Sequence, residues 1–392
     1  MNVNFEKVDV ENHFLKLFGE SSEPFQYYFC PGRVNLIGEH IDYNGGLVLP
    51  ASLTLGITAI VRPNKRNQIR IYSSNKGNLT TIHLKLPIEY NTEDDWGNYP
   101  KGIIAHILKS NISLQGFDAL YTSNLPDGSG LSSSAAIEVL TYYISLNNSI
   151  NKNTIDLVKI ALDSQSVENN FIGVNCGIMD QFAVAMGRKS HAILLNCESL
   201  EYKYIPVDLK DFMLVIMNTN KKRELAESKY NERRSECERS LAILNTKYNL
   251  PNLCSATLSQ IEEMLTDEPI LLKRARHVVT ENLRVRKAST LLSEGNLSEF
   301  GKLLIESHVS LRDDYEVTGK ELDVVVEEAL KIKGCIGARM TGAGFGGCAI
   351  ALVEKSIIAS FCDQVGQSYK ARTDKEASFY VSEIGNGVCK IF

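Results

Sequence analysis

Four short segments gather residue types that can do chemistry, and the loop at residues 126–136 is the most informative. It reads Pro-Asp-Gly-Ser-Gly-Leu-Ser-Ser-Ser-Ala-Ala. Glycines let a backbone approach a ligand closely, and the N-terminus of a following helix offers free N–H groups to an anion. The loop therefore suits a phosphate group, although a plain turn with a serine cap fits it equally well. It is not a Walker A loop, because no Gly-Lys-Ser/Thr follows.

A second glycine loop, residues 342–347, reads Gly-Ala-Gly-Phe-Gly-Gly and matches the dinucleotide fingerprint as a string. That fingerprint requires a strand before the loop and a helix after it. Here we expect a helix and a short connector before the loop, and a strand at residues 348–353 after it. The sequence therefore argues against a Rossmann fold and favours a tight turn beside a ligand.

The third segment, residues 31–46, places Arg33, Glu39, His40 and Asp42 among glycines. Sugar hydroxyls both donate and accept hydrogen bonds, and carboxylates can fix their orientation. We therefore expect a loop that suits a polyhydroxylated ligand, with a solvated polar loop as the alternative.

The fourth segment places Asp180 in an apolar run within residues 176–182. A carboxylate in such surroundings costs free energy unless it is paired. Arg33 is the candidate partner. A structural cap or a buried hydrogen-bond anchor is the alternative interpretation of Asp180.

The elements that must position these residues mix strands and helices in both halves of the chain. Hydrophobic patterns predict strands at 27–30, 56–61, 68–73, 117–123, 212–217 and 348–353. They predict helices at 101–109, 135–146, 154–169, 223–244, 258–265, 281–294, 299–310 and 321–333. We therefore expect an α+β protein of two domains, residues 1–205 and 206–392, with the active site in the cleft between them. The last strand is a candidate to return to the first domain.

The composition of the chain excludes several classes of binding partner. The chain has 392 residues, 44% of them hydrophobic and 23% charged, and this length favours two domains. Its net charge is −5 without a long basic run, so we expect no nucleic acid and no membrane as partners. No signal peptide or apolar membrane span is expected. Nine scattered cysteines without a CxxC pair fit a reducing compartment. We expect a cytoplasmic monomer.

In this order, the four segments resemble the GHMP family of small-molecule kinases and, within it, the galactokinases. The stretch 32–43 is similar to the galactokinase sugar motif, 126–136 to the family's phosphate loop, 177–182 to the segment of the catalytic aspartate, and 340–347 to the third motif. Further similar stretches are 96–102, 228–233 and 274–279. The phosphate loop has its galactokinase variant, with Ser132 where many relatives carry glycine. The chain departs from the pattern at two positions: Asn175 stands where many relatives carry proline, and Asp127 where a neutral residue is expected. We expect Asp127 to point to solvent.

The resemblance implies a role for each matching residue. Asp180 would take the proton from the C1 hydroxyl of the sugar, and Arg33 would keep Asp180 ionised and stabilise charge in phosphoryl transfer. Mg²⁺ would be bound by Ser134 and Glu168, and Trp96 would lie near the adenine of ATP. The implied sugar-binding residues are Glu39, His40, Asp42, Gly177 and Tyr230. The implied phosphate-binding residues are Gly128, Ser129, Gly130, Leu131, Ser132, Ser133, Ser134 and Ala135.

The implied reaction transfers the γ-phosphate of MgATP to the C1 hydroxyl of α-D-galactose, giving galactose 1-phosphate and ADP, as in the Leloir pathway of galactose catabolism. One open alternative is a related sugar 1-kinase that acts on N-acetylgalactosamine or arabinose. Another is a non-catalytic sensor of galactose and ATP. The intact serine–alanine stretch 132–136 and the presence of Asp180 favour the enzyme.

Overall fold

The computed structural model describes residues 7–126, 128–150, 154–221 and 226–391. One end of the molecule is built on a six-stranded sheet with the order β13-β1-β3-β6-β4-β5. Neighbouring strands are antiparallel except for β4 and β6, which are parallel. The strands are β1 (Gln26–Asn35), β3 (Pro50–Pro63), β4 (Gln68–Ser73), β5 (Asn78–His83), β6 (Phe117–Ser123) and β13 (Cys389–Lys390).

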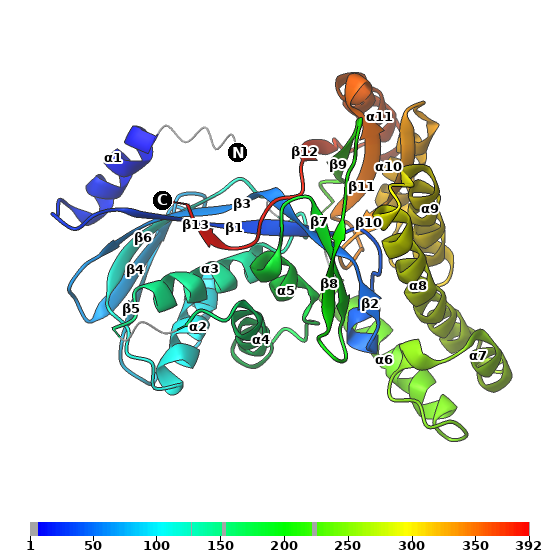
Figure 1. The fold of residues 1–392 in the computed structure, drawn as a ribbon, viewed down its shortest axis with the longest axis horizontal. Helices are drawn as coiled ribbons and strands as arrows, with labels where there is room; N and C mark the ends of the chain where they lie inside the picture. The colour runs from blue at the N-terminus through cyan, green and yellow to red at the C-terminus, as the bar shows by residue number, and fades with distance from the viewer. Residues whose placement is uncertain (1–6, 127, 151–153, 222–225, 392) are drawn as a thin grey trace.

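Helices cover one face of this sheet (Figure 1). They are α2 (Asn98–Lys109), α3 (Ser133–Asn147), α4 (Leu157–Val167) and α5 (Met179–Met186). Successive side chains of a strand point to opposite faces, so Tyr28 joins the main core while Tyr27 packs in a smaller cluster with Phe14 of α1 (Lys7–Phe18). The sheet is therefore buried on both faces along β1, the strand that leads into the sugar motif.

The other end holds a four-stranded antiparallel sheet, β10-β11-β9-β12, flanked by helices (Figure 1). Its strands are β9 (Phe212–Asn218), β10 (Cys335–Thr341), β11 (Cys348–Glu354) and β12 (Ser378–Ser382). The helices of this end are α6 (Ala226–Leu244), α7 (Leu258–Leu265), α8 (Pro269–Ser293), α9 (Leu297–Asp313), α10 (Lys320–Lys331) and α11 (Ile358–Thr373). A three-stranded sheet lies between the two ends and consists of β2 (Leu47–Val48), β7 (His191–Asn196) and β8 (Tyr202–Pro206).

The α+β class is confirmed, and the strands predicted at 68–73 and 117–123 have the predicted bounds. Three predictions of local structure are wrong. Strand β1 continues through a bulge between Pro31 and Arg33 to Asn35, so the segment 31–46 begins as a strand rather than a loop. The helix expected at 154–169 ends at Val167 and passes into a π-helical turn, Glu168–Ile172. Strand β10, not a connector, precedes the second glycine loop.

Each error has a physical cause. Bulges and π turns are local irregularities that hydrophobic periodicity does not encode. In β10, the buried polar residues Arg339 and Thr341 interrupt the apolar pattern expected of an inner strand. The argument against a Rossmann fold still holds, because β11 rather than a helix follows the loop. Within the described ranges, no helix combines the length and apolarity needed to cross a membrane.

Candidate active site

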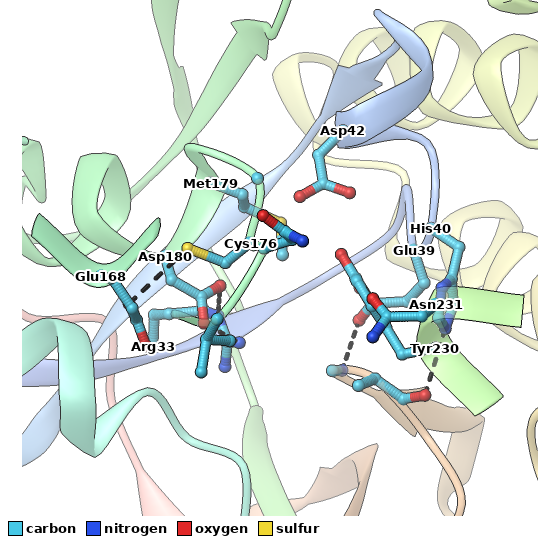
Figure 2. Close-up of a pocket in the computed structure, with 15 residues that line it drawn as sticks. Arg33, Glu39, His40, Asp42, Glu168, Cys176, Met179, Asp180, Tyr230 and Asn231 are labelled. Carbon is cyan, nitrogen blue, oxygen red and sulfur yellow. Dashed lines mark hydrogen bonds and ion pairs between the residues drawn. The ribbon is translucent and has the colours of Figure 1, made fainter. Parts of the chain in front are cut away.

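A cavity of about 290 Å³ lies where the two ends of the molecule meet. Figure 2 shows its walls: Asp180, Arg33 and Glu168 lie on one side, Glu39, His40 and Tyr230 on the other, and Asp42 above. Residues 33–42 and 168–180 belong to the first half of the chain, whereas Tyr230, Asn231, Gly342 and Ala343 come from the second. All the residues predicted to act on the sugar therefore line one cavity.

Asp180 lies in the first turn of α5 and forms a two-pronged ion pair with Arg33 of β1. Arg33 Nε donates to Asp180 Oδ1 at 2.8 Å and Nη2 donates to Oδ2 at 2.7 Å. This geometry matches the planar fork of a guanidinium to a carboxylate. The third guanidinium nitrogen, Nη1, donates to the Gly130 carbonyl at 2.8 Å. The partnership expected from the sequence is confirmed, and Arg33 also connects Asp180 to the phosphate loop.

Ser132 strengthens this connection in a way that the sequence did not reveal. Its hydroxyl donates to Asp180 Oδ2 at 2.5 Å instead of capping α3, the helix that it precedes. Its backbone is left-handed, with φ 62° and ψ 46°, which costs a residue other than glycine roughly 1–2 kcal/mol. A serine here therefore accepts backbone strain and gives Asp180 a further hydrogen-bond donor.

Glu39 is 1% exposed and is bound by the second half of the chain. Its Oε1 accepts from the backbone N–H of Gly342 at 2.8 Å and from the Thr341 hydroxyl at 3.1 Å. The fully buried Arg339 lies 3.4 Å from the same oxygen, and Asn35 donates to Oε2 at 3.0 Å. The carboxylate lines the cavity and at the same time joins the sugar motif to the third motif.

His40 is also held from two sides. Its Nε2 lies 3.2 Å from the Ala343 carbonyl and its Nδ1 lies 2.9 Å from the Tyr43 hydroxyl. Its ring contacts that of Tyr230 at a centroid distance of 5.6 Å. Burial, and then the neighbouring His277, lower the pKa of His40 to about 3. The imidazole is therefore neutral at physiological pH.

Asp42 differs from Asp180 and Glu39 because, among the described residues, no arginine or lysine pairs with its carboxylate. Burial raises its pKa to about 7, and the nearby charge of Asp180 adds to the shift. Gly177 faces this carboxylate so closely that a Cβ at Gly177 would lie 1.9 Å from Asp42 Oδ2. The glycine is therefore required for the close approach of the two segments, whatever its own contact with a ligand.

A second cavity, of about 250 Å³, opens beside the phosphate loop. Among the residues predicted to bind ATP, Trp96, Gly128, Ser133 and Ser134 line it. Trp96 Nε1 donates to Asn78 Oδ1 at 2.6 Å, which fixes the plane of the indole. Ser133 and Ser134 begin helix α3, so the free N–H groups of its first turn are available to an anion.

The other predicted phosphate-binding residues of the loop, which stay predictions, also make structural contacts. The Gly130 and Leu131 carbonyls accept hydrogen bonds from Arg33, the Ser129 hydroxyl donates to the Pro126 carbonyl, and Ala135 is buried in the core. The two parts of the loop therefore have different contacts. Ser133 and Ser134, at the start of the helix, line the nucleotide cavity, whereas Gly130 and Ser132 bind Arg33 and Asp180. Asp127, predicted to point to solvent, lies outside the described residues.

Glu168 begins the π-helical turn and lies near Ser134 at the start of α3. Gln181 donates through Nε2 to Glu168 at 2.5 Å and to the fully buried Glu138 at 3.3 Å. Burial and the charge of Asp180 raise the pKa of Glu168. The sequence reasoning missed Gln181 and Glu138. Glu138 follows Ser134 by four positions, a spacing that places both residues on one face of a helix, whereas Gln181 directly follows Asp180 and has no such signal.

Comparison with known proteins agrees with this geometry. Residues 12–63 match the galactokinase galactose-binding signature, residues 98–188 the N-terminal domain of GHMP kinases, and residues 288–371 their C-terminal domain. A galactokinase of Clostridium tetani is 52% identical, with 100% of this chain and 98% of that protein covered. A galactokinase of Fusobacterium nucleatum is 50% identical, with 96% and 98% covered.

Solved structures show the same relationship. The crystal structure of Lactococcus lactis galactokinase complexed with galactose superimposes with a TM-score of 0.92 at 43% identity, covering 98% of this chain and all of that one. A mevalonate kinase of Methanococcus jannaschii has a TM-score of 0.63 at 19% identity over 94% of this chain and all of its own, and shares the fold. On its motifs, its fold and its relatives, the chain belongs to the galactokinase family of ATP-dependent GHMP kinases.

Proposed function

We propose that the chain transfers the γ-phosphate of MgATP to the C1 hydroxyl of α-D-galactose, producing galactose 1-phosphate and ADP. The observation that carries the proposal is the position of Asp180. It lines the sugar cavity, and Arg33 and Ser132 connect it to the loop that borders the nucleotide cavity. A group at this junction can act on an acceptor hydroxyl that faces a phosphate.

Asp180 accepts the proton of the C1 hydroxyl while that oxygen forms a bond to the γ-phosphorus and the bond from phosphorus to the β-phosphate oxygen breaks. Arg33 fixes the orientation of the carboxylate and places positive charge beside the transferred group. Phosphoryl transfer depends mainly on such positioning and charge stabilisation. The proposed sugar-binding residues are Glu39, His40 and Tyr230 on the opposite wall, together with Asp42 and Gly177.

The residues around Glu168 fit a magnesium ion. Mg²⁺ keeps several water ligands and takes few from the protein, and among the described residues no cluster of three or more acidic, histidine or cysteine side chains could hold a metal alone. Glu138 Oε1 and Gln181 Oε1 are buried without a hydrogen-bond partner in the described chain, and water bound to a metal would be a suitable donor. Magnesium would offset the phosphate charge, with Ser134 and Glu168 as its protein ligands.

The test is ADP release from MgATP with galactose, glucose, N-acetylgalactosamine and arabinose as acceptors, alongside Asp180→Ala. We expect turnover with galactose that Asp180→Ala abolishes. Turnover confined to N-acetylgalactosamine or arabinose would move the substrate and keep the mechanism. Binding of ATP and galactose without turnover would refute the kinase and favour a sensor. ATP binding can be followed by the fluorescence of Trp96, the single tryptophan of the chain.

Other features stay predictions of the sequence. These are the domain division near residue 205, the monomeric state and the cytoplasmic location. The four-stranded sheet draws all its strands from residues 212–382, but the last strand of the chain, β13, pairs with β1 in the six-stranded sheet. A single boundary near residue 205 therefore does not separate the two sheets completely, because β13 lies beyond the boundary but belongs to the six-stranded sheet.

A further inference from the structure

A continuous chain of hydrogen bonds runs behind the sugar cavity and ends on its wall. Cys237 Sγ lies 3.1 Å from the Tyr315 hydroxyl, which lies 2.8 Å from the Tyr43 hydroxyl. The Tyr43 hydroxyl lies 2.9 Å from His40 Nδ1, and His40 Nε2 lies 3.2 Å from the Ala343 carbonyl. Cys237 and Tyr315 are 1% and 0% exposed, so water does not compete for these groups.

The end of the chain at Ala343 sets the direction of every bond in it. A carbonyl oxygen can only accept, so His40 Nε2 must carry a proton. The ring is neutral, so Nδ1 accepts and Tyr43 is the donor. The Tyr43 oxygen is then free to accept from the Tyr315 hydroxyl, and the Tyr315 oxygen from the Cys237 thiol.

The chain joins segments that are distant in the sequence. Cys237 belongs to α6, Tyr315 follows α9, Tyr43 lies in the short helical turn Asp42–Asn44, and Ala343 belongs to the third motif. Of its five members only His40 and Ala343 line the sugar cavity. Tyr43 and Tyr315 therefore act on a ligand only through His40.

Glu39 and His40 bind consecutive residues of the third motif. Glu39 accepts the Gly342 N–H and His40 donates to the Ala343 carbonyl (Figure 2). At this wall the Glu39 carboxylate offers acceptors, and the imidazole, with Nδ1 occupied, offers one N–H. A single N–H can be shared between two acceptors. The pair thus suits a group that donates to one and accepts from the other, which among sugar substituents is a hydroxyl.

Resting on the proposed function, we infer that Tyr43 and Tyr315 are positioning residues that lock His40 in its Nε2–H form and thereby make it read one sugar hydroxyl as a donor beside the acceptor Glu39. Tyr43 acts directly on His40, Tyr315 acts through Tyr43, and Cys237 acts through both. Removal of the Tyr43 hydroxyl should therefore disturb the binding of the sugar most, removal of the Tyr315 hydroxyl less, and removal of the Cys237 thiol least.

The first test does not need activity. In ¹⁵N NMR spectra at neutral pH, the His40 ring, assigned by its loss in His40→Gln, should show a protonated Nε2 and an unprotonated Nδ1. In Tyr43→Phe a fraction of Nδ1–H ring should appear, because only the 3.2 Å contact with the Ala343 carbonyl then favours the Nε2–H form. Tyr142→Phe is the matched control, since this tyrosine is 1% exposed and donates to Asp163 at 2.6 Å outside both cavities. An Nδ1–H or doubly protonated ring in the unmutated protein would overturn the inference.

The second test separates affinity from turnover. One buried hydrogen bond contributes enough to change binding about tenfold, so Tyr43→Phe should raise KM for galactose roughly tenfold and change kcat about threefold at most. Tyr315→Phe should raise KM about threefold, and Cys237→Ala about twofold or less, because a thiol is a weak donor. Tyr142→Phe should leave both constants unchanged. A larger effect of Tyr315→Phe than of Tyr43→Phe would contradict the order of the chain.

Monodeoxy galactoses then identify the hydroxyl. For one position, the loss of kcat/KM on removing the hydroxyl should be several-fold smaller in Tyr43→Phe than in the unmutated enzyme, because the two changes remove the same interaction. If the loss of kcat/KM is the same in Tyr43→Phe as in the unmutated enzyme for every deoxy position, His40 does not bind a sugar hydroxyl in the proposed way. If the unmutated chain fails to phosphorylate galactose, the proposed function is wrong, while the NMR experiment still decides whether the tyrosines lock His40.

Discussion

The wall that faces the sugar and the loop that faces the phosphates are organised in opposite ways. On the sugar side, Glu39 and His40 are held by partners from the far end of the chain, Gly342 and Ala343. On the phosphate side, Ser133 is exposed and Ser134 half-buried, and the anion site consists of backbone N–H groups at the start of α3. Discrimination between sugars needs side chains fixed before the ligand arrives, whereas a phosphate needs only converging N–H groups and positive potential.

Asp180, where the two regions meet, should show the largest effect. Asp180→Asn keeps the shape of the side chain but cannot take up a proton, so kcat should fall roughly 10²–10⁴-fold. ATP affinity, followed by Trp96 fluorescence, should stay within about twofold because the nucleotide cavity is unchanged. A fall of less than about tenfold in kcat would show that the carboxylate serves mainly as an anchor for Arg33.

Gly177→Ala tests how rigid the sugar wall is. The new Cβ would meet the Asp42 carboxylate at 1.9 Å, and the displaced Asp42 should raise KM for galactose roughly 10–10²-fold. The KM for ATP should not change. Gly128→Ala is the comparison on the phosphate side: its Cβ would meet nothing within 4 Å, and the strain comes only from a φ of +64°. An equal effect of both changes on galactose KM would contradict the contrast between the two regions.

The pH dependence of sugar capture should report Asp42. With a pKa of about 7, Asp42 is mostly neutral at pH 6 and mostly ionised at pH 8. Because a carboxylate accepts hydroxyl hydrogen bonds better than the neutral acid, kcat/KM for galactose should rise about tenfold over this interval. Asp42→Asn should lower the plateau and remove the rise. A profile of the same shape in Asp42→Asn would assign the titration to another group.

The raised pKa of Asp42 also makes the free energy of unfolding depend on pH, and the free energy falls as the pH rises. The folded state holds the Asp42 proton at pH values where the unfolded chain has lost it, since the pKa rises from 3.8 to about 7 on folding. The contribution of Asp42 to the free energy of unfolding is therefore complete below about pH 4 and declines as the pH rises through 7. Asp42→Asn should flatten this part of the stability profile measured by urea unfolding.

Ser132→Gly should give the smallest change, with opposite effects on stability and activity. Glycine removes the left-handed strain at φ 62°, so the free energy of unfolding of Ser132→Gly should exceed that of Ser132→Ala, which also lacks the hydroxyl, by about 1 kcal/mol. Loss of the hydroxyl from Asp180 should lower kcat by roughly three- to tenfold. Ser132→Ala is the control, because it loses the hydroxyl and keeps the strain. Equal stabilities of the glycine and alanine variants would rule out the strain.

The bounds of β4 and β6 were predicted to the residue. In β4 the signal is apolar alternation, because alternate side chains of a strand point to opposite faces. The pairing of Asp180 with Arg33 was predicted from a simpler rule, that a carboxylate in an apolar run needs a partner. Neither route reveals Tyr43 or Tyr315. Their hydroxyls act through contacts between segments up to 300 residues apart, as from His40 to Ala343, and no local pattern encodes such contacts.

The pairing of β13 with β1 has a consequence for how the protein folds during its synthesis on the ribosome. Tyr28 pairs with Lys390, so the edge of β1 waits for a partner made almost a whole chain length later. At roughly 5–20 residues per second this interval lasts about 20–70 s. During that time the edge offers unpaired backbone groups to any neighbouring nascent chain, so aggregation through β1 is a hazard until translation ends.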